Sequence, residues 1–141
     1  MSVNSDLCFA IYAAIFISIV AISGCATGSF QDQNGIWTGI GYQLDDSQSG
    51  SGEYSSWSVL LTTDDQLVTI SYPSLNCGGN WQLESSTTLA SYYRENITFG
   101  LDDCLDQVLV VVSPIDGGRL RLEYYYPDDT FLAFAYLNSE K

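Results

Sequence analysis

"QVLVVVSPIDGGRLRLEYYY", residues 107–126, decides the fold that this sequence predicts. Apolar and β-branched residues fill 107–113, and in 118–126 apolar residues alternate with charged ones. Both runs are typical of β-strands, and Asp116-Gly117 between them is among the strongest sequence signals for a hairpin turn. We therefore expect two antiparallel neighbouring strands here.

The same alternation continues on both sides of this hairpin. It occurs in six further segments, 35–43, 55–63, 66–72, 80–86, 90–99 and 130–138. No window carries a helical stripe of useful length, and short turns separate most of the segments. About eight strands in series predict an all-β fold, an antiparallel meander that hides its edges as a closed barrel or as a two-sheet sandwich. We favour the closed barrel.

Charge and length narrow the class of protein. The chain has 141 residues with 17 acidic and four basic side chains, no histidine and a net charge of −13. This length suits one modest domain, and the charge argues against a nucleic-acid partner because the phosphate backbone demands clustered Lys and Arg.

An apolar run from Leu7 to Ser23 ends in the sequence Ile22-Ser23-Gly24-Cys25. A run of this length is typical of the hydrophobic part of a signal peptide. The four residues resemble the lipobox of bacterial lipoproteins. The resemblance implies a signal peptide over 1–24 and a lipidated Cys25 that begins a tether over 25–34. The strand patterns and the length then predict a single β domain over 35–141.

The resemblance also implies a location in the cell envelope. Because Ala26 rather than Asp follows the lipidated cysteine, we expect an anchor in the outer membrane facing the periplasm, if the organism is Gram-negative. The segment before the apolar run carries no Lys or Arg, which leaves an uncleaved transmembrane helix over 7–26 as the alternative. Both interpretations put the globular part outside the cytoplasm.

The remaining cysteines fit an oxidising compartment. Cys8 lies in the segment that would be removed and Cys25 takes the lipid, so Cys77 and Cys104 are left as a pair for which we expect a disulfide. Such a bridge stabilises a small domain by about 3 to 4 kcal/mol. Metal binding by the two thiolates is the alternative, but the chain has neither histidine nor a CxxC motif.

Two stretches, "ISYPSLNCGGNWQL" (70–83) and "YRENITFGLDDC" (93–104), resemble a small extracytoplasmic β-domain of bacterial secreted proteins and lipoproteins with a YPSLxCGG motif. The resemblance implies an exported location and the same disulfide, but no reaction. From the residues alone, Pro73 ends a strand and Gly78-Gly79 forms a tight reversal. Arg94 and Glu95 fall on opposite faces of one strand, so either one of them points inward or the strand ends there, and we expect Arg94 to pair with a carboxylate.

The opening Gly35 to Trp37 has the Gly-x-Trp pattern and resembles the first strand of lipocalin-like barrels. The alternative is that Trp37 simply plugs one end of a core.

The residues available for catalysis predict a protein that is not an enzyme. Without histidine or a free thiol in the mature form, the commonest general base and a strong nucleophile are both missing. Paired carboxylates could serve a glycosidase, with Glu84, Glu95, Asp102 and Asp103 available, and calcium could use Asp102, Asp103 and Asp106. No Asp-x-Asp-x-Asp-Gly loop is present, and we expect neither a metal nor a cofactor.

Binding is the function that composition favours, since negative charge speeds the encounter with a cationic protein and orients it. The candidate partner-binding residues are the acidic pairs in turns, Asp45, Asp46, Asp64, Asp65, Asp102 and Asp103, and the outward-facing Arg119, Arg121 and Tyr125 of 118–126.

Three functions remain open. The first is a lipid-anchored inhibitor or immunity protein against a cationic hydrolase or toxin, by analogy with periplasmic lysozyme inhibitors and immunity lipoproteins. The second is an accessory envelope lipoprotein that binds an assembly through 107–138. The third is a carrier with a small ligand in the barrel, which an interior filled by Trp37, Trp57, Trp81 and tyrosines would exclude.

Overall fold

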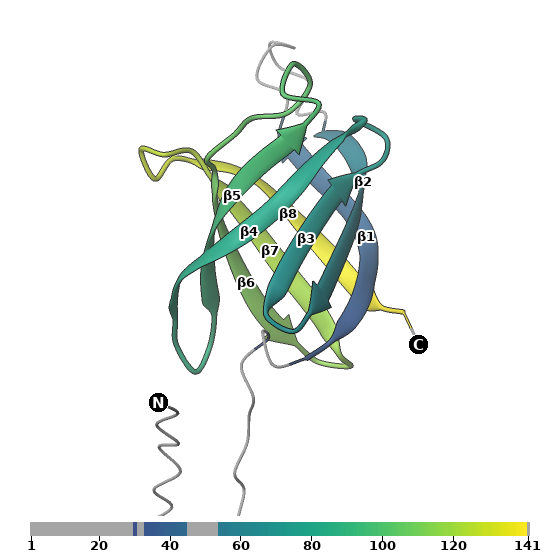
Figure 1. Ribbon diagram of the computed structural model, residues 1–141, viewed down its shortest axis with the longest axis vertical. Helices are drawn as coiled ribbons and strands as arrows, with labels where there is room; N and C mark the ends of the chain where they lie inside the picture. Colours follow the sequence, from purple (N-terminus) through teal and green to yellow (C-terminus); the bar gives the residue numbers. More distant parts are fainter. Residues whose placement is uncertain (1–29, 31–32, 45–53, 141) are drawn as a thin grey trace, which may run out of the picture.

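The computed structural model of the protein describes residues 30, 33–44 and 54–140. In these residues eight antiparallel strands follow one another, each hydrogen-bonded to the next, and the last pairs with the first to close a barrel (Figure 1). The strands are β1 (Gly35–Leu44), β2 (Tyr54–Asp64), β3 (Leu67–Tyr72), β4 (Cys77–Ser86), β5 (Ser91–Phe99), β6 (Leu109–Ile115), β7 (Arg119–Tyr125) and β8 (Phe131–Ser139). The expected meander and its closed-barrel form are confirmed, and the sandwich alternative is wrong.

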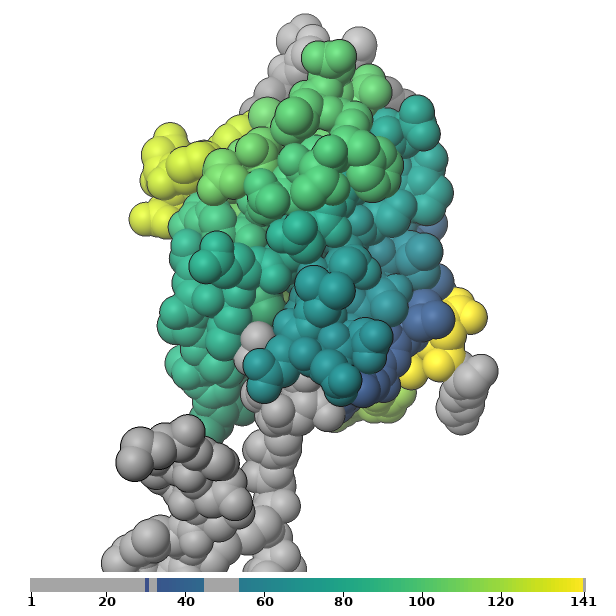
Figure 2. Space-filling model, in the orientation of Figure 1, coloured from purple at the N-terminus to yellow at the C-terminus, as the bar shows by residue number. Residues whose placement is uncertain are grey.

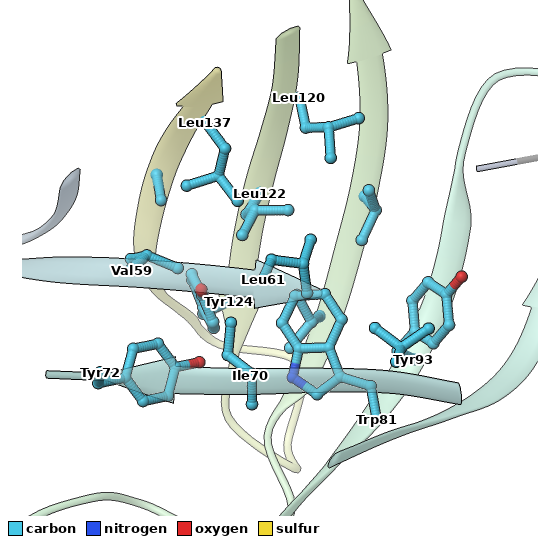
Figure 3. Packing of buried hydrophobic residues seen from close by; sticks show 14 of the residues in the cluster. Val59, Leu61, Ile70, Tyr72, Trp81, Tyr93, Leu120, Leu122, Tyr124 and Leu137 are labelled. Atoms are coloured by element: carbon cyan, nitrogen blue, oxygen red, sulfur yellow. The ribbon is translucent and has the colours of Figure 1, made fainter. Parts of the chain in front are cut away.

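Inward and outward positions alternate as the sequence predicted. In β1 Trp37 is buried while Ile36 and Ile40, at outward positions of the same strand, are exposed, and in β7 Leu120 and Leu122 are buried on the inner side. Every strand contributes at least one buried side chain to a single core, and Figure 3 shows residues of this core converging from opposite walls. The period of two therefore sorts the chain into an apolar interior and a polar outer surface.

One end of the barrel is filled by aromatic rings. The ring of Trp37 lies 5.2 Å from that of Phe30, and Phe30 in turn meets Tyr93 edge-on at 6.3 Å. Both Phe30 and Trp37 are almost completely buried. We call the end at which β1 begins the closed end, and Trp37 acts there as the plug that the sequence left as one alternative.

Tight turns join the strands at the closed end. Asp65 and Gln66 connect β2 to β3 and both have positive φ, of 45° and 73°, as a type I′ turn requires. The hairpin expected at Asp116-Gly117 is present between β6 and β7, but its loop also includes Gly118, whose φ is 72°. The loop therefore has three residues, and Gly supplies the left-handed conformation at two of them.

The expected reversal at Gly78-Gly79 is wrong. Both glycines belong to β4, and the chain reverses before it, in a turn over 73–76 that follows the end of β3 at Tyr72. A Cβ on Gly79 would lie 1.9 Å from the carbonyl oxygen of Asn96 on β5. Glycine is needed there for a close approach of two strands at an irregularity in their register, and the sequence signal for that use is the same as for a turn.

Successive connections between strands lie at opposite ends of the barrel because neighbouring strands are antiparallel. The β3–β4, β5–β6 and β7–β8 connections gather at the end away from the closed end, which we call the mouth (Figure 1). In the space-filling view the β5–β6 loop stands at this end and the β7–β8 loop projects beside it (Figure 2).

The predicted disulfide between Cys77 and Cys104 is present, with the two Cα atoms 6.2 Å apart. Cys77 is the buried first residue of β4, and Cys104 lies in the β5–β6 loop. The bridge therefore ties this loop to the rim of the barrel at the mouth.

Closure of the barrel leads to a prediction about Gly39. A Cβ at this position would lie 2.0 Å from the carbonyl oxygen of Tyr136 on β8, too close for either backbone to accept. We expect Gly39→Ala to lower the free energy of unfolding by about 3 kcal/mol, measured by urea denaturation. Ile40→Ala, next to it on the outer face, is the control and should cost about 1 kcal/mol or less. A Gly39→Ala variant as stable as the wild type would contradict this account of closure.

A buried carboxylate in a pocket at the mouth

Glu95 is the one buried carboxylate of the described residues, with 3% of its surface exposed. It points inward because the alternation of β5 puts Tyr93, Glu95 and Ile97 on the inner face. Arg94 points outward, where it donates to both carboxylate oxygens of Glu84 at 2.9 and 3.1 Å. The expectation that Arg94 pairs with a carboxylate is confirmed.

Two donors from neighbouring strands hold the Glu95 side chain. Its Oε1 accepts a hydrogen bond from the Tyr72 hydroxyl at 2.6 Å and another from the Trp81 indole nitrogen at 2.9 Å. Figure 3 shows the Tyr72 hydroxyl and the Trp81 nitrogen turned toward each other inside the barrel. The other oxygen, Oε2, accepts no hydrogen bond from the described residues. The carboxylate is thus oriented through Oε1, and Oε2 can accept a hydrogen bond from a ligand.

Burial raises the pKa of Glu95 to about 7, against an ordinary value of 4.5. The hydrogen bonds from Tyr72 and Trp81 act in the opposite direction, and the nearby charge of Asp106 raises the pKa further. No Arg or Lys of the described residues forms an ion pair with Glu95, since the two salt bridges found there join Arg94 to Glu84 and Arg121 to Glu123. The carboxyl group is therefore buried without a counter-ion.

Tyr124 adds a second buried polar group beside Glu95. Its side chain is 3% exposed, and its hydroxyl faces that of Tyr72 without a hydrogen bond of normal geometry to any described residue. Its ring meets that of Tyr72 at 6.4 Å. Burial, followed by the charge of Glu95, raises the pKa of Tyr124 well above its ordinary value, so this hydroxyl stays neutral.

These groups line a pocket of about 130 Å³ that reaches inward from the mouth. Its polar lining comes from Glu95, Tyr72, Tyr124, Gln43 and Asp103, and its apolar lining from Trp57, Leu75, Cys104, Leu105, Val108, Leu132 and Ala133. Aromatic rings thus pack the closed end, and this pocket lies near the mouth.

The β5–β6 loop forms one side of this pocket. The amide nitrogens of Asp103 and Cys104 both bond to the carbonyl oxygen of Gly100, which closes a tight turn. Asp106 then folds back, and its Oδ1 accepts a hydrogen bond from the Ile97 amide at 2.9 Å. The disulfide fixes the loop between these two anchors, so that residues of the turn border the pocket.

The described charges within the three loops at the mouth are all negative, although Arg94 of β5 donates to the carbonyl oxygen of Gln107 in one of them. Exposed aspartates stand in the β5–β6 loop and in the β7–β8 loop, namely Asp102, Asp103, Asp106, Asp128 and Asp129. We call these five residues the acidic rim. The three arginines that the structure describes lie on the strands: Arg94 on β5, and Arg119 and Arg121 on β7. The rim therefore presents a single sign of charge.

The structure separates the residues that the sequence grouped as partner-binding candidates. Asp102 and Asp103 belong to the acidic rim, whereas Asp64 and Asp65 stand at the closed end, where Asp65 bonds to Asn34. Asp45, Asp46 and Cys25 lie outside the described residues.

The other candidates are on the outer face of β7, as expected. Arg121 pairs with Glu123, and the ring of Tyr125 packs edge-on against Phe131 at 5.6 Å. Arg119 bonds to the carbonyl oxygen of Asp116 beside the closed end. These residues follow one strand along the wall and do not converge on a site.

A row of exposed and half-buried aromatic side chains runs along the outer wall formed by β1, β2 and β8. Phe134 of β8 stacks on Tyr42 of β1 at 5.5 Å and meets Tyr54 and Tyr136 edge-on. Phe131 and Tyr54, at the mouth end of this row, are each about half exposed. We call these five residues the aromatic strip.

Sequence reasoning named Glu95 among the carboxylates but missed Tyr72, Tyr124 and Trp57 as its pocket neighbours. A charged residue flanked by apolar ones in an inward register is a signal for an internal carboxylate. Nothing in the sequence shows which residues of other strands will meet it, because those contacts follow from the register of the whole barrel.

A cluster of metal-ligating side chains is absent from the part of the chain that the structure describes. No three side chains of the types that ligate metals gather there, and Asp106 is turned to a backbone amide instead of toward Asp102 and Asp103. No helix within the described ranges has the length and apolar character needed to cross a membrane. The segment 7–26 lies outside them.

Comparison with known protein families, with curated proteins and with solved structures finds no match to this chain. Its function is therefore inferred from its own residues and geometry.

The raised pKa of Glu95 predicts how stability changes with pH. Between about pH 4.5 and pH 7 the unfolded chain loses this proton while the folded protein keeps it, so the free energy of unfolding falls by about 3 kcal/mol. Below this window and above it, Glu95 adds no further change.

Glu95→Gln keeps the shape of the side chain, but its amide does not ionise. The variant should therefore lack this part of the pH dependence. The measurement is urea denaturation of both proteins at about pH 5 and about pH 8. The free energy of unfolding of the variant should rise relative to that of the wild type at the higher pH. An equal difference between the two proteins at both pH values would contradict the burial of an ionising carboxyl group.

Proposed function

We propose that this chain is a non-catalytic binding protein of the bacterial cell envelope, held on a membrane by lipid at Cys25, which captures a cationic protein at the mouth of its barrel. Inhibition or neutralisation of a basic hydrolase or toxin is the activity that such capture would produce. The observation that carries the proposal is the acidic rim around a pocket that itself ends in a buried carboxylate.

The direction of the rim supports this proposal. The described chain enters the barrel at the closed end, where Phe30 packs against Trp37, while the acidic rim stands at the opposite end (Figure 1). A lipid on Cys25, only a few residues before Phe30, would hold the closed end near the membrane. The rim would then face away from the bilayer, toward a soluble partner.

The electrostatics of the rim suit a cationic partner in particular. Five exposed aspartates within two neighbouring loops produce a field that accelerates the encounter with positive charge and repels anions. At the edge of the same mouth, Tyr54 and Phe131 of the aromatic strip offer apolar contact area of the kind that interface hot spots use. Charge would steer the partner, and the aromatic rings would add contact energy.

The size of the pocket supports binding over catalysis. Sites for small-molecule substrates commonly enclose about 300 to 1,000 Å³, whereas this pocket has about 130 Å³. A sugar ring between two carboxylates does not fit this space, and Glu84 lies outside the barrel in an ion pair with Arg94. The same limit disfavours a carrier of ligands the size of those in lipocalin barrels.

The anchor can be tested by itself. When the chain is expressed in a bacterial host with labelled palmitate, the wild-type protein should take up the label and sediment with membranes. Cys25→Ala should lose the label, because no other side chain at this position can accept the diacylglyceryl group. A wild-type protein that carries no label would refute the lipoprotein part of the proposal and favour an uncleaved helix.

Capture at the acidic rim predicts an asymmetry between the two ends of the barrel. With a panel of lysozymes as cationic probes, Asp102→Asn/Asp103→Asn should slow association by about threefold or more at low ionic strength. The control is Asp64→Asn/Asp116→Asn, which removes the same charge from exposed positions at the closed end and should change the rate much less. Stopped-flow or biosensor kinetics at low and high salt give both rates.

Three results would count against the rim. If both variants slow association equally, the net charge of the protein, and not the position of the rim, controls the rate. Association that salt does not weaken would point to apolar contacts. Failure of every cationic probe to bind would remove the inhibitor interpretation.

The aromatic strip supports a second candidate, an accessory envelope protein docked to an assembly through the wall of β1 and β8. Phe131, Tyr136 and Tyr54 are each exposed over nearly half or more of their surface, which is unusual for rings on a monomer. Association through this wall would persist at high salt, so the salt series above also separates the two candidates.

A further inference from the structure

Glu95 occupies a position at which an apolar side chain would be less costly. A buried carboxylate without a counter-ion destabilises a fold, and here none of the described arginines approaches it. Its Oε1 is held by Tyr72 and Trp81, while its Oε2 accepts nothing from the described residues. The arrangement orients the Glu95 carboxylate toward the pocket and leaves this group without a counter-ion.

The Tyr124 hydroxyl is a second polar group of the pocket that the protein leaves without a full set of hydrogen bonds. It is buried, lines the pocket, and makes no hydrogen bond of normal geometry within the described chain, although it faces the Tyr72 hydroxyl that already donates to Glu95. Buried hydroxyl groups are normally satisfied, and one that is not points to a group that enters from outside. A ligand with N–H donors could bond to the oxygen of Tyr124 and to Glu95 at once.

The remainder of the lining defines the shape of that ligand. Trp57, Leu75 and Leu132 form an apolar wall between the mouth and the carboxylate, and aromatic faces attract cations. The volume of about 130 Å³ is close to the about 150 Å³ that holds one benzene molecule in an engineered cavity. The pocket therefore fits one small head group with a short apolar stem.

We propose that the mouth pocket binds a single alkylammonium or alkylguanidinium group, whose charge lies against the Glu95 carboxylate and whose stem lies against Trp57, Leu75 and Leu132. This inference deepens the proposed function and rests on it in one respect, since a Lys or Arg side chain of the cationic partner is one source of the group. A free small amine is the other source. The acidic rim attracts either of them toward the pocket.

Binding should also depend on pH. The titratable groups that face Glu95 or share its pocket are Tyr72 from β3, Tyr124 from β7, and Asp103 and Asp106 from the β5–β6 loop. Burial raises the pKa of both tyrosines, so they stay neutral, and Glu95 is the group that changes charge around pH 7. The cation should therefore bind about tenfold more tightly at pH 8 than at pH 6.

The first experiment uses small probes on the full chain in non-ionic detergent micelles. The probes are n-butylammonium and n-propylguanidinium, with n-butanol as the neutral control and butyrate as the anionic one. The indole N–H signals of Trp57 and Trp81 report binding by NMR, since the first residue lines the pocket and the second bonds to Glu95. We expect saturable shifts with a Kd of about 1 mM for the cations only, as suits ligands of this size.

Variants locate the site. Glu95→Gln should weaken cation binding at least tenfold. Tyr124→Phe should weaken it about threefold with little loss of stability, because that hydroxyl has no hydrogen bond of normal geometry to lose. The second variant keeps the test decisive if the first fails to fold. Tyr136→Phe, on the outer wall, is the matched control and should bind like the wild type.

The second experiment separates the two sources. Lysozyme capture is measured with wild-type protein and Glu95→Gln, with and without n-propylguanidinium as competitor. Weaker capture by the variant and competition by the small cation would support insertion of a partner's side chain. Binding of small cations without any capture of cationic proteins would support the pocket with a free amine and refute the proposed function.

Two results would overturn the pocket inference. The first is cation binding that Glu95→Gln leaves unchanged. The second is lysozyme capture that neither this variant nor the small cation affects, which would keep the proposed function and remove the pocket from it.

Discussion

Closure of the sheet between β1 and β8 is the constraint on which the rest of this structure depends. The two strands pair along seven residues of β1, and Gly39 allows their backbones to approach. Once the sheet is closed, every second side chain points into an interior of fixed width, and the outer surface belongs to the remaining positions. Aromatic rings fill one end of this interior, and the pocket beside Glu95 lies at the other.

Glu95 shows what closure does to a polar residue. In an open strand its carboxyl group could turn to solvent, but in β5 the alternation that buries Tyr93 and Ile97 buries Glu95 as well. The barrel then brings Tyr72 and Trp81 from two neighbouring strands to one of its oxygens. The pair of donors reduces the cost of burial without cancelling it, which is why the pKa of the group still lies at about 7. A chain that keeps such a group gives up stability at that position, as functional sites often do.

The charge of the protein divides into two parts with different physical effects. The acidic rim is exposed to solvent and acts at long range, where salt screens it, so it influences the rate and direction of an encounter. Glu95 is buried and acts only on a group that enters the pocket, where low polarity strengthens a direct charge pair. The disulfide connects the two parts, because it holds the loop of Asp102 and Asp103 over the pocket that contains Glu95.

The sequence by itself determined the eight strands, their inward and outward faces, the disulfide partners and the pairing of Arg94 with a carboxylate. These follow from period-two alternation, turn chemistry and cysteine counting, which act over short distances along the chain. Only the tertiary structure decided that the sheet closes, that Gly78 and Gly79 serve a close strand approach, and that Asp64 and Asp102 stand at opposite ends. It alone brought Tyr72, Trp81 and Tyr124 to Glu95, because contacts between strands depend on register, closure and packing, which no local pattern contains.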